Sequence, residues 1–169
     1  MSAIAMRGTP RSASSCVLAG GLVAATLDLV YASLFWGIKI GFTPVQIMQS
    51  IAAGWLGSDA AYGGGASAAG LGLISHYGIA LVMAACYYAA SLRWPALALR
   101  PLRYGALYGV LLYAAMTYVV VPLSRAGGGT LPAWRWENLS HIAVHILLVG
   151  VPCALAARCA MRRRAPAAA

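Results

Sequence analysis

Four long apolar runs dominate the sequence and limit what the chain can fold into. They cover residues 17–36, 70–90, 104–121 and 141–160. A helix needs about 20 residues to cross the hydrocarbon core of a bilayer, and a backbone in lipid must satisfy its own hydrogen bonds. The sequence therefore predicts an all-α integral membrane protein, in which a single domain forms a bundle of four spanning helices.

The composition supports a membrane protein over a soluble one. Hydrophobic residues make up 62% of the 169 residues and charged residues only 9%, whereas a soluble domain carries about 25% charged residues. The net charge is +9, but the basic residues flank the apolar runs. That arrangement is typical of membrane topology signals, so we expect the partner to be the lipid bilayer and not a nucleic acid.

A further short helix is predicted between the first two spans, over residues 44–55. Thr43 is a good N-cap, and Pro44 suits the first helical position. At about 12 residues the segment is too short to cross a bilayer, so it is interpreted as an interfacial or re-entrant helix. Small residues four apart, at Gly21 and Ala25 and at Gly105 and Gly109, are typical of close helix crossings in lipid.

The distribution of Lys and Arg predicts the orientation of the spans. Both termini and the second connection share one side of a four-span bundle, and that side holds nine of the twelve basic residues, including the basic tail 161–169. Only Lys39, Arg125 and Arg135 fall on the other side. The positive-inside rule then places both termini in the cytoplasm and the loop before the fourth span outside.

With this orientation, four titratable residues share the middle to outer part of the bundle. Asp28 lies slightly past the middle of the first span, and His76, His141 and His145 lie in the outer third of theirs. A carboxylate at the bilayer centre costs about 2.5–3.5 kcal/mol on insertion scales, so Asp28 should face the bundle interior. Glu137, His141 and His145 recur every fourth residue and would line one stripe of a helix.

These residues allow several interpretations, which the sequence leaves open. His76 and His145, on different helices, could ligate haem iron axially. His141, His145 and Asp28 could hold a metal ion, because two histidines four apart on a helix face the same way. The histidines could instead make structural hydrogen bonds between helices, or take part in proton transfer or quinone contact. Asp28 could pack structurally or serve as a proton-coupled carboxylate.

The remaining motifs indicate no enzyme class. The chain contains no phosphate-binding loop, HExxH motif, nucleophile elbow or dinucleotide fingerprint. The four cysteines, at positions 16, 86, 153 and 159, form no CxxC pair. They predict neither a disulfide framework nor a zinc site, since cysteines in spans usually behave as small hydrophobic residues.

Several stretches carry a family resemblance: GGLVAATLD from Gly20, PVQIMQSIAAGWLG from Pro44, GGGASAAGLG from Gly63 and YVVVPLS from Tyr118. Together they resemble a group of small uncharacterised bacterial inner-membrane proteins with four spans. The NLSHIAVH entry to the last span is more distantly similar to YagU-like proteins of the DUF1440 type. The resemblance implies a bacterial plasma membrane location and no particular activity.

The sequence thus favours a non-enzymatic inner-membrane protein that acts as an accessory or interaction subunit. One alternative is a haem- or metal-binding redox protein that uses His76, His141 and His145. Another is a small transporter coupled to protons through Asp28. Because four spans leave little room for a pathway, we expect such a transporter to form a homo-oligomer.

Overall fold

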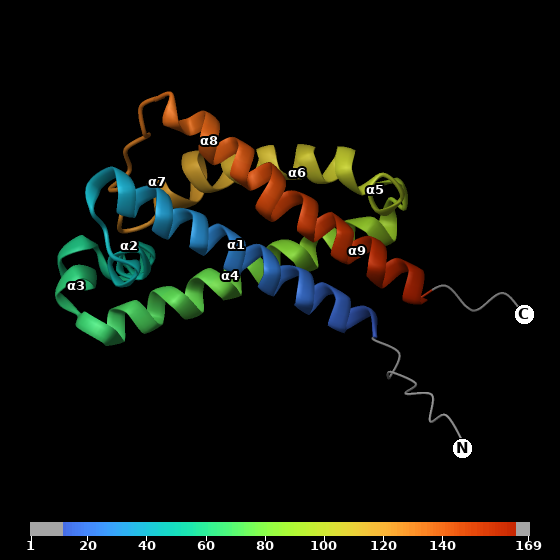
Figure 1. The fold of residues 1–169 in the computed structure, drawn as a ribbon, viewed down its shortest axis with the longest axis horizontal. Coiled ribbons are helices and arrows are strands. Elements are labelled where there is room, and N and C mark those ends of the chain that lie inside the picture. The colour runs from blue at the N-terminus through green and yellow to red at the C-terminus, as the bar shows by residue number, and fades with distance from the viewer. Residues whose placement is uncertain (1–11, 165–169) are drawn as a thin grey trace, which may run out of the picture.

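The computed structural model describes residues 12–164, which form helices and connecting loops with no strand among them. Four long helical segments form an antiparallel bundle (Figure 1). They are α1 (Ala13–Ile40), α4 (Gly65–Arg93), the continuous run α6–η1–α7 (Pro101–Ala115, Met116–Val120, Val121–Leu123) and the continuous run α8–η2–α9 (Glu137–Val144, His145–Gly150, Val151–Arg164). Each is long and apolar enough to cross a membrane. The predicted all-α four-helix membrane bundle is therefore confirmed.

Three short helices complete the described chain: α2 (Pro44–Leu56), α3 (Ser58–Gly63) and α5 (Ala96–Leu99). The predicted start of α2 is confirmed by a capping box. The Thr43 hydroxyl accepts from the Gln46 amide at 3.3 Å, and the Gln46 side chain accepts from the Thr43 amide at 2.9 Å. The buried side chain of Gln49 donates to the carbonyl of Gly65, which fastens α2 to the start of α4.

The long helices extend beyond the predicted apolar runs at both ends. α1 begins after Ser12, whose side chain caps the first turn, and ends at Gly41, whose φ of 75° stops the helix. Nothing in the polar flanking residues breaks a helix, so the helices continue past the residues that hydropathy alone identifies. α9 likewise continues to Arg164, into the predicted basic tail. The rest of that tail, and the two basic residues at positions 7 and 11, lie outside the described residues.

Two spans contain a proline, and each widens into a π-helical segment just before it. η1 precedes Pro122, and η2 precedes Pro152. A proline has no amide hydrogen, and its ring clashes with the carbonyl four residues earlier, which here belongs to Tyr118 or Leu148. The wider π turn moves that carbonyl away and lets the helix continue. Pro122 therefore lies inside the last turn of its helix.

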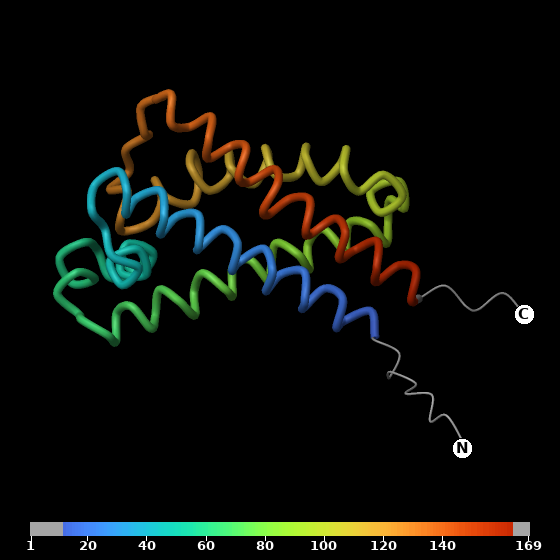
Figure 2. Tube along the Cα trace, in the orientation of Figure 1, coloured from blue at the N-terminus to red at the C-terminus, as the bar shows by residue number. Residues whose placement is uncertain are grey.

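Small residues let the helices pack closely at the end of the bundle where α1 begins and α9 ends. Figure 2 shows α1, in blue, running beside α9, in red, and the two are in contact along their length. The core there consists largely of small side chains that are nearly inaccessible, among them Ala24, Ala84, Cys153, Ala154 and Ala157. Both small-residue patterns mark close approaches. A Cβ on Gly21 would lie 2.8 Å from the Leu81 side chain.

The outside of the bundle is apolar, as a lipid-facing surface must be. Large hydrophobic side chains such as Leu18, Val30, Ile74, Val82 and Leu111 are more than half exposed. A soluble protein would not leave so many apolar side chains uncovered along four helices. The chain is therefore a multi-pass membrane protein in its architecture.

The sequence predicts no disulfide framework, and that prediction misses one bond in the structure. Cys16, near the start of α1, and Cys159, near the end of α9, are joined, with their Cα atoms 5.9 Å apart. They are separated by 143 residues, so only the pairing of α1 with α9 brings them together, and nothing in their spacing could indicate it. Cys86 and Cys153 are free thiols.

Candidate ligand-binding cavity

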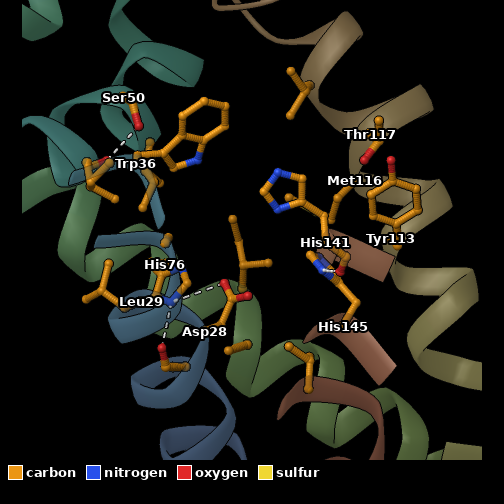
Figure 3. Close-up of a pocket in the computed structure, with 18 of the residues that line it drawn as sticks. Asp28, Leu29, Trp36, Ser50, His76, Tyr113, Met116, Thr117, His141 and His145 are labelled. Atoms are coloured by element: carbon orange, nitrogen blue, oxygen red, sulfur yellow. Dashed lines mark hydrogen bonds and ion pairs between the residues drawn. The ribbon is translucent and has the colours of Figure 1, made fainter. Parts of the chain in front are cut away.

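A cavity of about 620 Å³ lies among the helices at the end of the bundle that holds α2. Its walls come from α1, α2, α4, α6–η1 and α8–η2, and it runs from Ala24 in the middle of α1 to Lys39 at its end. The volume is within the range of about 300–1,000 Å³ that is typical of small-molecule sites. Most lining residues are apolar. Inside the cavity two groups of polar side chains face each other (Figure 3), and charged residues lie at its rim.

Asp28 and His76 form the first polar wall. The His76 Nε2 atom lies 2.9 Å from the carbonyl oxygen of Ala25 and 4.0 Å from an Asp28 carboxylate oxygen. A carbonyl can only accept, so Nε2 carries a hydrogen and donates it to Ala25. Among the described residues none donates a hydrogen bond to the Asp28 carboxylate, which points toward the middle of the cavity in Figure 3. Its oxygens are therefore available to a bound molecule.

His145 and Tyr113 stand on the opposite wall. The His145 Nδ1 atom lies 2.9 Å from the carbonyl oxygen of His141, so it donates there, and in the neutral ring Nε2 keeps a free lone pair. The Tyr113 ring meets the His145 ring edge to face, with 5.6 Å between centroids. Thr117, one turn after Tyr113, adds a hydroxyl to the same wall. This wall can therefore both accept and donate hydrogen bonds.

Aromatic rings surround His141 at the outer part of the cavity. The imidazole stacks on Trp36, with centroids 5.8 Å apart, and meets Phe35 edge to face at 4.8 Å. Tyr31 lies at the edge of the His141 ring and donates its hydroxyl hydrogen to Ser140. These contacts hold the His141 ring against α1 in the outer part of the cavity.

Charged residues close the rim of the cavity. Glu137 forms ion pairs with Lys39 and with Arg135, the latter at 3.0 Å. The Lys39 ammonium also lies over the rings of Phe35 and Trp36, at 5.5 and 5.3 Å from their centroids. Arg135 precedes α8 in the chain, and Lys39 reaches the same carboxylate from the end of α1. Both rim cations are therefore already paired with one carboxylate.

All four titratable residues singled out from the sequence line this one cavity. His76 and His145 stand on opposite walls, as the haem prediction requires, although His76 already uses its Nε2 atom. Within residues 12–164, no three His, Cys, Asp or Glu side chains gather in a way that could hold a metal ion. The metal site at His141, His145 and Asp28 stays a prediction.

Sequence reasoning missed the residues that give the cavity its shape. Trp36 and Lys39 follow Asp28 at spacings of eight and eleven, so they continue its helix face, and that periodicity could have identified them. Ser50 and Ile51 of α2 also line the cavity. They could not be found from sequence, because nothing there shows that α2 folds back against α4.

Comparisons with protein-family models, curated proteins and solved structures find no match to this chain.

Proposed function

We propose that the protein is a non-enzymatic bacterial inner-membrane protein that binds a small ligand in this cavity. The observation that carries the proposal is the pair of facing polar walls, Asp28 with His76 and His145 with Tyr113, in an otherwise apolar cavity of about 620 Å³. A carboxylate inside a membrane bundle has an energetic cost and is usually retained for function. A binding role fits the accessory or interaction subunit that the sequence favours.

A cavity-filling substitution tests this proposal. Ala32 lines the cavity from α1, whereas Ala19 on the same helix faces outward. Protein purified in mild detergent would be extracted with organic solvent, and the extract analysed by mass spectrometry for small molecules that co-purify in stoichiometric amount. We expect such a molecule in the wild-type and in Ala19→Phe, and its loss in Ala32→Phe. Equal amounts in both variants, or none in the wild-type, would contradict the proposal.

Haem is the second candidate for the ligand, because the Nε2 atom of His145 is unengaged and His76 faces it. A histidine that donates from Nδ1 to a carbonyl is oriented as metal-bound histidines commonly are. Absorption spectra with and without dithionite, and elemental analysis of the same sample, test this candidate. A Soret band that disappears in His145→Ala supports it. Colourless, metal-free protein excludes both haem and the metal-site prediction.

The orientation of the protein is a separate part of the proposal. The excess of basic residues supports a cytoplasmic location for the end of the bundle where α1 begins and α9 ends. The Cys16–Cys159 disulfide is at that same end, and disulfides persist mainly in oxidising compartments. The two observations agree if the cysteines are held as adjacent thiols in the reducing cytoplasm and become joined only on oxidation.

A further inference from the structure

A second hollow opens on the outside of the bundle, next to the cavity. This lateral groove has a volume of about 460 Å³ and lies between α4, at Gly78 and Val82, and α6–η1, at Ala115 and Val120. Val82 and Val120 are 61% and 43% exposed. At the end near α2, the Trp55 indole bounds the groove and donates to the Ser75 hydroxyl at 3.0 Å. The groove is therefore an apolar channel on a lipid-facing surface.

Three side chains separate the lateral groove from the cavity. Ile79, Met83 and Met116 line both hollows. Methionine is unbranched and changes rotamer easily, so two of the three can move without a shift of the backbone. Met116 also begins the π-helical segment η1, a kind of irregularity that often marks functional sites. The boundary between groove and cavity can thus open by side-chain motion alone.

The packing of the bundle explains why the opening occurs here. α1 packs on α4 and α9, and α6 packs on η2 and α9, but α4 and α6 are joined chiefly through side chains. One of these is Tyr108, whose hydroxyl donates to the carbonyl of Met83 at 2.9 Å. Beyond that contact, toward α2, the two helices diverge around the groove. A ligand can therefore enter sideways from the lipid.

The chemistry of the two hollows restricts the ligand. The groove suits one apolar chain of a ligand. The cavity suits a head group of that ligand with polar atoms at two opposite edges, one facing Asp28 and the other facing His145 and Tyr113. A phosphate or carboxylate head would meet the Asp28 carboxylate at the inner end. At the rim it would find Lys39 and Arg135 already paired with Glu137. An anionic head is therefore disfavoured, and the free acceptors on both walls suit a head that donates hydrogen bonds at two opposite edges.

From these features we infer that the ligand is the quinol form of a quinone with a single polyprenyl chain, its head in the cavity and its chain in the lateral groove. Such a head is planar, neutral and carries oxygens at opposite edges. In the quinol form, one hydroxyl donates to Asp28 and the other to the Nε2 atom of His145. This inference rests on the proposed function, because it names the ligand class of the same cavity.

The groove can be blocked without touching the cavity. A Cβ built on Gly78 meets no atom within 4 Å, and Gly78 does not line the cavity. Gly70, on the same helix, is equally unobstructed and lies outside the groove. Gly78→Phe and Gly70→Phe are therefore a matched pair, in which only the first should obstruct the chain of the ligand.

The inference is tested by the binding of two probes to the protein in phosphatidylcholine nanodiscs. Binding is measured as quenching of tryptophan fluorescence. The probes are a benzoquinone with a decyl chain, kept reduced as its quinol, and the same quinol without a chain. We expect the decyl probe to bind Gly78→Phe at least tenfold more weakly than wild-type and Gly70→Phe. The chainless probe should bind all three equally, and Asp28→Ala should weaken both probes.

Two results would overturn the inference. One is unchanged binding of the decyl probe to Gly78→Phe, and the other is no saturable quenching in the wild-type. If quinone fails to bind but a co-purified molecule is still lost in Ala32→Phe, the cavity binds a ligand of another class and the proposed function stands. Retention of phosphatidylglycerol in native mass spectra, lost in Gly78→Phe, would replace the quinone with a phospholipid.

Discussion

The contact between α6 and η2 permits a sharp test of the packing that holds His145 in place. A Cβ built on Gly109 would lie 2.5 Å from the Cα of Ile146 and 2.7 Å from the carbonyl carbon of His145. Ordinary carbon contacts are about 3.5–4.0 Å, so Gly109→Ala must push the two helices apart by about 1 Å. Such overpacking typically costs about 1–3 kcal/mol.

The intrinsic helix preference of alanine opposes this cost, because Gly to Ala inside a helix is favourable by about 1 kcal/mol. Gly70→Ala isolates that contribution, since a Cβ on Gly70 meets no atom within 4 Å. The difference between the two variants therefore contains the packing cost alone. We expect Gly109→Ala to be less stable than Gly70→Ala by about 1–3 kcal/mol.

Reversible unfolding in mixed micelles, by titration with sodium dodecyl sulfate, measures both free energies of unfolding. Near-ultraviolet circular dichroism checks that the native packing of the aromatic residues is retained. The displaced backbone of His145 should also weaken ligand binding in Gly109→Ala and not in Gly70→Ala. Equal stability of the two variants would refute the close helix contact, and with it the placement of η2 against α6.

Three further predictions follow from single features. Thr43→Ala removes the capping box of α2 and should lower the free energy of unfolding by about 0.5–2 kcal/mol in the same titration. Asp28→Asn should fold with equal or greater stability, because it removes a charge from the interior of a membrane bundle, yet it should bind ligand more weakly. Clear destabilisation would make Asp28 a structural residue. If the start of α1 and the end of α9 are cytoplasmic, Cys16 and Cys159 should react with a thiol-alkylating reagent in freshly lysed cells and become unreactive after oxidation. A pair already protected on lysis would indicate the opposite orientation.

Hydropathy predicted the architecture because lipid imposes a strict rule. A backbone that crosses a bilayer must be helical or a closed barrel, so four apolar runs near 20 residues long leave few alternatives. Local signals were similarly reliable: Thr43 and Pro44 marked the start of α2. Gly105 and Gly109 marked a close crossing, and a Cβ on Gly105 would indeed lie 3.0 Å from Gly150 and Val151.

The features that the sequence did not reveal all depend on contacts between distant segments. The disulfide needs α1 and α9 to be neighbours, and the wall of the cavity at Ser50 needs α2 to fold back. The π-helical widening before Pro122 and Pro152 depends on how each helix resolves a local clash, which periodicity does not encode. Depth in the membrane could place Asp28 and the histidines in one layer, but it could not show that they face one cavity.

The position of the cavity follows from an imbalance of side-chain size along the bundle. At the end where α1 begins, alanine, cysteine and glycine let the helices approach closely, and residues such as Ala24, Cys153 and Ala157 are fully buried. Toward the other end the facing residues become large, with Trp36, Tyr113 and His141 around the same space. Helices that are held close at one end and kept apart by rings at the other must diverge, and the short helix α2 covers only part of the gap. Asp28 lies where the divergence begins. The carboxylate therefore lies away from the charged rim, among mostly apolar lining residues, where a hydrogen bond to a bound head group is stronger than in water.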